Sequence, residues 1–208
     1  MFLTKSELKE KLSQPLPGAV SHLKMAPGYR KAELLSNRYD LSKAKLSAVL
    51  ILLIPEADRL KIAFIKRSEY DGVHSGQIAF PGGSFETTDA SFEQTALRET
   101  FEEIGLPSDA IEIMGQLSDL YISPSNFLVK AFVGYCDQKP EFVIDRNEVQ
   151  SVIEIDHDDF RNANTIAEKE FFSASNNFKI IAPCYSVHKV DIWGATAMIL
   201  TELLDMLM

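Results

Sequence analysis

The sequence predicts an α/β sandwich (α+β) in which a mixed β-sheet lies between helices. Apolar runs typical of strands stand before and after an isolated amphipathic helix at about 90–104. A second segment with helical spacing of apolar residues follows at about 193–207. The 208 residues are 46% hydrophobic and 25% charged, a composition that lets a globular chain bury a sizeable core.

Residues 1–44 are expected to form a helix and an irregular arm that packs on a main domain of residues 45–208. A short helix is predicted at 5–12, because Thr4 can cap it and Glu7 stands three residues later, as in a capping box. Prolines and glycines interrupt residues 14–41, which show little periodicity, so no regular structure is expected there.

Three strands are predicted before the central helix. The run at 46–54 is rich in Leu, Val and Ile, and a second strand at 60–66 follows a turn at 55–59, so the two form a hairpin. A short strand at 77–80 runs into a Pro-Gly-Gly turn at 81–83.

The central helix at 90–104 has a predicted start and stop. Ser91 with Gln94 fits a capping box, and Gly105 fits a C-terminal stop. Four further strands are predicted, at 111–117, 127–135, 149–155 and 179–187.

Three carboxylates share one face of the central helix. Glu99, Glu102 and Glu103 stand at positions i, i+3 and i+4, where like charges destabilise a helix unless a cation lies against them. A solvated acidic face paired with Arg98 is the ordinary explanation of such a cluster. Here the cluster also ends at a Gly-Leu stop, and a Phe-Pro-Gly-Gly turn at 80–83 precedes the helix. A hard divalent cation explains both features, because it prefers oxygen ligands and glycines permit close backbone approach.

The segment from Gly83 to Leu106 resembles the Nudix box, which reads Gly, five residues, Glu, seven residues, Arg-Glu-apolar-x-Glu-Glu-x-Gly-apolar. The second half matches residue by residue, with Thr100 in the apolar slot. In the first half Asp89 replaces the Glu, and one extra residue separates it from Arg98, so we interpret Asp89 as a helix cap. The resemblance implies the Nudix fold and the metal-dependent hydrolysis of a diphosphate linked to another moiety.

A second motif lies upstream of the box. Arg67-Ser68, seven residues, and the segment 76–83 resemble an added signature of the coenzyme A diphosphatase subfamily. The extra residue in the box and Trp-Gly-Ala-Thr-Ala at 193–197 are also similar to that subfamily. Gly72 departs from the pattern, which has an Arg there. The resemblance implies hydrolysis of coenzyme A or its derivatives to 4′-phosphopantetheine and adenosine 3′,5′-bisphosphate.

The expected catalytic groups follow from the box and from residue chemistry. Glu99, Glu102 and Glu103, with a backbone carbonyl from Gly82-Gly83, are expected to hold Mg²⁺ or Mn²⁺. Such ions neutralise the diphosphate and lower the pKa of a bound water. Glu99 and Glu148 are the candidates for the general base, and the alternative is that metal-bound hydroxide suffices without one.

Other residues are expected to bind substrate or support the site. Arg67 is a candidate for the substrate phosphates. The full set of expected substrate-binding residues is Arg67, Ser68, His74 and Gln77. Arg98 and Gly105 are expected to be structural, and Trp193 is expected to anchor the last helix in the core.

Charge and hydropathy exclude several partners. A net charge of −9 repels nucleic-acid phosphates, whereas metal ions can neutralise a small anionic substrate. No apolar run approaches the roughly 20 residues of a membrane span, and no secretory pattern is visible, so no membrane partner and a cytoplasmic location are expected. Cys136 and Cys184 are expected to be buried, reduced thiols. Leu34 and Leu35 are candidates for a homodimer interface.

Three alternatives remain open. The first is a Nudix hydrolase for ADP-ribose, NADH or an oxidised nucleotide. The second is a non-catalytic Nudix-fold binding module, which would normally show erosion of the Glu cluster that is intact here. The third is an isoprenoid diphosphate isomerase, which needs a reactive cysteine in its site.

Overall fold

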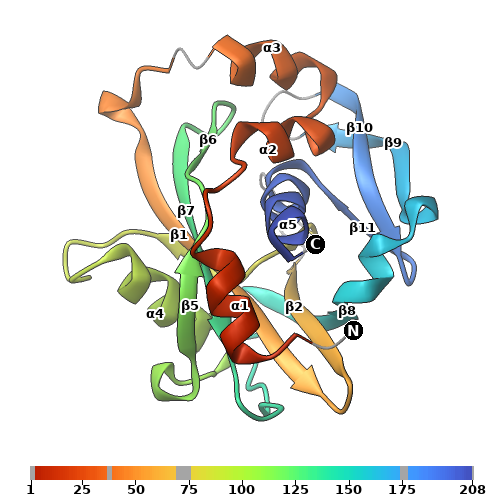
Figure 1. Ribbon diagram of the computed structural model, residues 1–208. Helices are drawn as coiled ribbons and strands as arrows, with labels where there is room; N and C mark the ends of the chain where they lie inside the picture. The colour runs from red at the N-terminus through yellow and green to blue at the C-terminus, as the bar shows by residue number, and fades with distance from the viewer. Residues whose placement is uncertain (1–2, 37–38, 69–75, 174–177, 208) are drawn as a thin grey trace.

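The centre of the molecule is a mixed β-sheet whose main path runs β3-β2-β1-β7-β5 (Figure 1). The computed structural model describes residues 3–36, 39–68, 76–173 and 178–207. In this sheet β4 also pairs with β1, β6 with β7, and β8 with β2. Its strands are β1 Lys45–Glu56, β2 Arg59–Arg67, β3 Ile78–Ala79, β4 Gly82–Ser84, β5 Glu112–Gln116, β6 Leu120–Ile122, β7 Phe127–Tyr135 and β8 Val149–Asp156.

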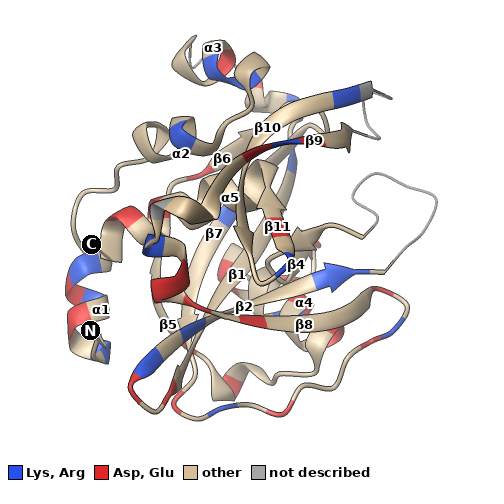
Figure 2. Ribbon diagram, turned by 90° about the vertical axis from the view of Figure 1, so that its right-hand side faces the viewer, with Lys and Arg blue, Asp and Glu red and all other residues tan. Residues whose placement is uncertain are grey.

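A smaller antiparallel sheet and several helices surround this centre. The smaller sheet has the order β11-β10-β9, with β9 Ile166–Ser173, β10 Phe178–Val187 and β11 Val190–Trp193 (Figure 2). The helices are α1 Lys5–Leu12, α2 Ala19–Met25, α3 Gly28–Ser36, α4 Phe92–Ile104 and α5 Gly194–Leu207. Short 3₁₀ turns lie at Leu41–Lys43, Ser108–Ala110, His157–Arg161 and Ala163–Thr165.

Strand β1 separates two hydrophobic cores. It pairs antiparallel with β2 and parallel with β7, so both of its faces must be covered. Ile51 and Leu53 pack in the core that contains α5 and the N-terminal helices. Leu50 and Leu52 pack in the other core, which contains the buried face of α4. The predicted α/β sandwich with a mixed sheet is therefore confirmed, as is the hairpin of β1 and β2.

Helix α4 begins and ends close to the predicted positions. Ser91 is its N-cap, and the Ser91 hydroxyl accepts a hydrogen bond from the Gln94 N–H at 3.1 Å. The Gln94 side chain accepts from the N–H of Ala90, one residue before the position that a capping box requires. Gly105 ends the helix with φ of 71°. The interpretation of Asp89 as the cap was wrong, because Ser91 occupies that position.

The prediction of no regular structure in residues 14–41 was wrong. This segment contains α2 and α3. Helix α2 follows Gly18, and no side chain caps it. Instead, the Gly18 N–H and His22 Nε2 lie 3.1 and 3.0 Å from the carboxylate of Glu202 in α5. Tertiary contact therefore stabilises a helix that local sequence does not favour.

Three strands were not predicted, and one turn was assigned wrongly. The strands are β6, β9 and β11, and the predicted turn at 81–83 overlaps β4, which pairs with β1. Strand β9 carries consecutive charged residues at 168–170 and lacks the period-2 pattern. Strands β6 and β11 have only three and four residues.

Two further expectations concern cysteines and membranes. Cys136 and Cys184 are free and buried, as expected. Among the described helices, none is long and apolar enough to cross a bilayer.

The N-terminal segment packs on the rest of the chain through α1 against β5 and α2 against α5. The predicted division between this segment and a main domain at residue 44 stays a prediction.

Candidate active site

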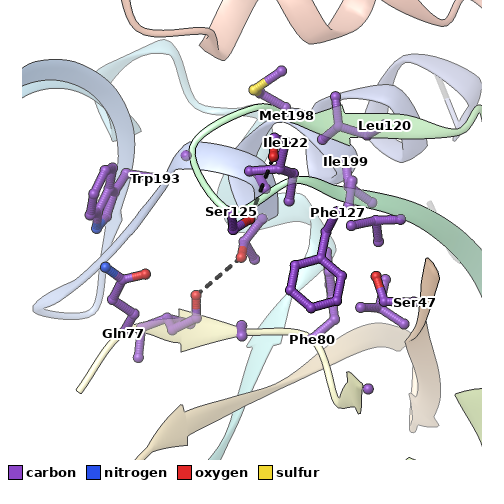
Figure 3. A pocket seen from close by; sticks show the side chains of 18 of the residues that line it. Ser47, Gln77, Phe80, Leu120, Ile122, Ser125, Phe127, Trp193, Met198 and Ile199 are labelled. Carbon is purple, nitrogen blue, oxygen red and sulfur yellow. Dashed lines mark hydrogen bonds between the residues drawn. The ribbon is translucent and has the colours of Figure 1, made fainter. Parts of the chain in front are cut away.

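A pocket of about 540 Å³ lies between the large sheet, the N-terminal segment and the start of α5. Figure 3 shows Trp193 and Gln77 on one side of it and Phe127 and Ser47 on the other. Carboxylates line one end, namely Glu99 and Glu103 of α4 together with Glu148. The pocket thus combines an acidic end with a largely apolar wall.

Glu103 is the most buried acid of this end, with 1% of the residue exposed. Its Oε2 accepts a hydrogen bond from the Gly82 N–H at 2.8 Å, and its Oε1 lies 3.7 Å from Nη2 of Arg67. Burial raises the pKa of Glu103 to about 7, although Arg67 and the Gly82 N–H favour the ionised form. The charges of Glu99 and Glu148 raise this pKa further.

Glu99 lies directly against strand β4. A Cβ atom added at Gly83 would stand 2.4 Å from the Glu99 carboxyl carbon, so only glycine leaves room for this side chain. At Gly82, where φ is 147°, an added Cβ would stand 2.3 Å from the backbone oxygen of Ala48. Gly82 therefore permits the pairing of β4 with β1, and Gly83 permits the approach of the carboxylate.

Arg98 organises the acids beside the pocket. Its Nε and Nη2 donate to the two oxygens of Asp89 at 2.9 and 3.0 Å, and Nη2 also donates to the Ser84 carbonyl at 3.0 Å. Its Nη1 donates to Glu99 at 3.0 Å and to Glu102 at 2.9 Å. The guanidinium holds the pKa of Asp89 well below its usual range. The Glu102 side chain is 53% exposed, and it is turned toward Arg98 instead of lining the pocket.

Similar proteins share this combination of fold and acidic helix. The family model of the NUDIX domain matches residues 44–174, which is more than half of the chain. Nudix hydrolase 3 of Caenorhabditis elegans is 30% identical over 203 residues, covering 90% of this chain and 82% of that protein. The chain belongs to the Nudix hydrolase family. An uncharacterized Nudix hydrolase NudL of Yersinia enterocolitica is 33% identical over 159 residues, covering 76% of this chain and 78% of the relative.

A solved Nudix structure has the same fold. The MutT/nudix family protein from Enterococcus faecalis aligns with a TM-score of 0.52 and 17% identity, covering 98% of this chain and 74% of that one. Family membership confirms the expectation of an enzyme that hydrolyses diphosphates of the nucleoside diphosphate-X type.

The acidic end of this Nudix hydrolase fits a hard divalent cation. Glu99, Glu103 and Glu148 offer carboxylate oxygens, and the backbone of Gly82 and Gly83 lines the same end. Burial raises the pKa of Glu99 as well as that of Glu103, so the two acids resist ionisation together. A bound cation offsets this cost, and oxygen-only donors suit ions such as Mg²⁺ and Mn²⁺.

The structure brings together only part of the predicted set. The pocket is lined by Arg67, Gln77, Gly82, Gly83, Glu99, Glu103 and Glu148. The Ser68 hydroxyl donates to the Arg146 carbonyl at 3.1 Å, away from the pocket lining. Gly105 lies at the far end of α4, where an added Cβ would meet Val143 at 2.7 Å. His74 and Gly72 lie outside the described residues.

Several lining residues were not predicted from sequence. They come from the N-terminal segment, the β6–β7 hairpin and α5, and they include Tyr29, Ile122, Met198 and Ile199. The expectation that Trp193 anchors a core was wrong, because this residue is partly exposed and lines the pocket. Its ring stacks on Phe171 of β9 with centroids 4.4 Å apart. The similarity of residues 193–197 to the coenzyme A diphosphatase subfamily was the one sequence signal for this wall.

Proposed function

We propose that this Nudix hydrolase cleaves the diphosphate bond of coenzyme A or its derivatives, with Mg²⁺ or Mn²⁺, to give 4′-phosphopantetheine and adenosine 3′,5′-bisphosphate. The observation that carries the proposal is the single pocket that joins an acidic end to a long, mostly apolar wall. Coenzyme A is divided in the same way, because its diphosphate links a nucleotide to the extended pantetheine chain. The resemblance of residues 67–83 to the coenzyme A diphosphatase signature supports the same substrate.

Each residue of the acidic end has a proposed role. Glu99, Glu102 and Glu103, with a carbonyl of Gly82 or Gly83, would hold the divalent ions. The ions, when bound, neutralise the diphosphate and lower the pKa of a coordinated water. Arg98 fixes the orientation of Glu99 and Glu102 through its Nη1 contacts.

The chain also supplies the groups for proton transfer and substrate binding. Hydrolysis adds water across the P–O–P linkage: an oxygen–phosphorus bond forms at one phosphorus while the other phosphate leaves with the bridging oxygen. Glu148 or Glu99 accepts the proton of the attacking water. Arg67 and Gln77 line the pocket and are the proposed substrate contacts. Substrate roles for Ser68 and His74, the cytoplasmic location and a homodimer stay predictions.

One assay tests the substrate. The purified protein is incubated with Mg²⁺ or Mn²⁺ and, separately, with coenzyme A, ADP-ribose, NADH and nucleoside triphosphates, and the products are identified by mass spectrometry. We expect coenzyme A to give the two named products, and chelation of the metal to stop the reaction until Mg²⁺ or Mn²⁺ is restored. Turnover of ADP-ribose without turnover of coenzyme A would overturn the proposal.

A further inference from the structure

The two ends of the pocket come from different parts of the chain. The acidic end lies within residues 44–174, the segment that matches the NUDIX domain model. Part of the opposite wall comes from outside this segment. Those lining residues include Pro27, Tyr29 and Arg30 from the N-terminal segment and Met198 and Ile199 from α5. The segment that matches the family model thus supplies the acidic end, and the added segments supply part of the opposite wall.

The N-terminal part of this wall is fixed to α5. The Glu202 carboxylate, which is fully buried, accepts hydrogen bonds from the N–H groups of Gly18 and Ser118 and contacts His22. Lys24 donates to Asp205 at 2.7 Å. Figure 1 shows α2 lying against α5, so helix α2 is held in place beside the pocket.

Arg30 fixes helix α3 to the β6–β7 hairpin. Only 4% of Arg30 is exposed, and its guanidinium donates to the Tyr121 carbonyl at 2.5 Å and to the Ser123 hydroxyl at 2.6 Å. It also forms an ion pair with Glu33. The Arg30 guanidinium therefore binds groups of the protein itself and is treated as a structural contact. The neighbouring Tyr29 lines the pocket and is 49% exposed, so its side chain is available to a ligand.

The chemistry of this wall defines its occupant. Apart from the committed Arg30, its side chains carry no charge and are largely apolar, namely Pro27, Tyr29, Ile122, Pro124, Met198 and Ile199. We infer that the wall is a subsite for an extended, largely apolar substituent of the diphosphate, with Tyr29 as a specificity-determining contact and Arg30 as a positioning residue. This inference rests on the proposed function only in that the pocket takes a substituted nucleoside diphosphate.

The test compares ligands that share an adenosine diphosphate unit, which carries an added 3′-phosphate in coenzyme A, and that differ in the substituent. Tyr29→Ala is the test variant, and Lys31→Ala is the matched control, because Lys31 lies on the same helix, is exposed and does not line the pocket. For each protein, kcat and KM are measured with coenzyme A and ADP-ribose. Dissociation constants for ADP, which lacks a substituent, are measured from the fluorescence of Trp193, the sole tryptophan of the chain and a lining residue.

We expect Tyr29→Ala to raise KM for coenzyme A about tenfold, equivalent to about 1.4 kcal/mol, with little change in kcat or in ADP binding. Lys31→Ala should match the wild type. Arg30→Met should reproduce the change in KM at unchanged kcat, and Arg30→Lys should partly restore it. Equal effects of Tyr29→Ala on coenzyme A and ADP, or no effect on either, would overturn the inference.

Failure of the proposed function is distinguishable from failure of this inference. If coenzyme A is not hydrolysed, the substrate proposal falls, and the same variants are then titrated with ADP-ribose and NADH against ADP by Trp193 fluorescence. Weaker binding of a substituted diphosphate to Tyr29→Ala than to wild type, with ADP binding unchanged, would still support the subsite, and an equal loss of ADP binding would overturn it. Unchanged binding of every ligand would overturn it.

Discussion

At the residue scale, the buried acid Glu103 should oppose stability when no metal is bound. Burial raises its folded-state pKa to about 7, so the folded protein binds this proton more tightly than the unfolded chain does. The favourable contribution of Glu103 to the free energy of unfolding is fully present below the pKa that this residue has in the unfolded chain. This contribution is lost as the pH rises through about 7. We therefore expect the melting temperature of the metal-free protein to fall between pH 5 and pH 8.

The substitution Glu103→Gln should separate stability from activity. At pH 8 it should raise the melting temperature of the metal-free protein by roughly 2 to 4 °C, the shift expected for about 1 kcal/mol in a chain of this size. Activity should fall at least a hundredfold, which exceeds the typical loss from mutating an outer-sphere partner of a metal ligand. Glu93→Gln, an exposed residue in the first turn of the same helix, is the control and should change neither quantity. Retained activity of Glu103→Gln would contradict the proposed metal site.

The adjacent glycines should respond differently to alanine. Gly83→Ala places a Cβ against the flexible end of Glu99, so we expect a folded protein with stability within about 1 kcal/mol of wild type and much lower activity. Gly82→Ala places a Cβ against the backbone of β1, so it should lower the free energy of unfolding by about 2 to 4 kcal/mol. Gly28→Ala, which meets no atom within 4 Å, should remain stable and active. Denaturant melts and rate assays measure both effects, and equal destabilisation at Gly82 and Gly83 would refute the distinction.

At the element scale, α4 and the loop before it depend on the planar guanidinium of Arg98. Lysine keeps the charge but cannot reach both Asp89 oxygens and the Ser84 carbonyl together. Arg98→Lys should therefore lower the free energy of unfolding by about 1 to 3 kcal/mol. It should also raise the metal concentration needed for half-maximal activity. Arg161→Lys is the control, since its exposed pair with Asp158 should contribute under about 1 kcal/mol. Identical melting temperatures for Arg98→Lys and wild type would show that the guanidinium geometry is dispensable.

Elements were predictable where the local pattern and the packing agree. Helix α4 carries its own cap at Ser91 and stop at Gly105, and the apolar run of β1 predicts its burial. Helix α2 lacks a side-chain cap, and its partner Glu202 lies 180 residues from His22, so no window of sequence contains the cause of that helix. Strand β9 is specified by its pairing with β10 and not by alternation.

In the candidate site, too, some features follow from the local sequence and others depend on tertiary contacts. The positions of Glu99 and Glu103 followed from helical spacing, because one helix carries both. The outward turn of Glu102 depends on Arg98, and the contribution of Tyr29 depends on the docking of a segment far away in sequence. Spacing predicts which residues share a face of one element, but it does not predict which elements meet.

At the scale of the whole molecule, Glu202 connects the N-terminal segment to α5. Burial raises its pKa, but hydrogen bonds from His22, Ser118 and Gly18 outweigh this effect and leave the pKa below its usual value. Glu202→Gln places an amide group, which is partly a donor, against groups that are themselves donors. It should therefore lower the free energy of unfolding by about 2 to 4 kcal/mol. Trypsin should then cleave the N-terminal segment faster, as followed by mass spectrometry. Glu10→Gln, at an exposed position of α1, is the control, and equal cleavage rates of the two variants would argue against this connection.

The long separation between His22 and Glu202 has a consequence for biosynthesis. The ribosome makes His22 180 residues before the carboxylate with which it pairs. At a synthesis rate of about 5 to 20 residues per second, this interval lasts roughly 10 to 40 s. During that time α2 lacks α5, the helix on which it mainly packs, so its apolar residues are accessible to chaperones. Helix α4 can assemble on the nascent sheet, whereas the wall proposed to select the substrate is completed only after α5 emerges.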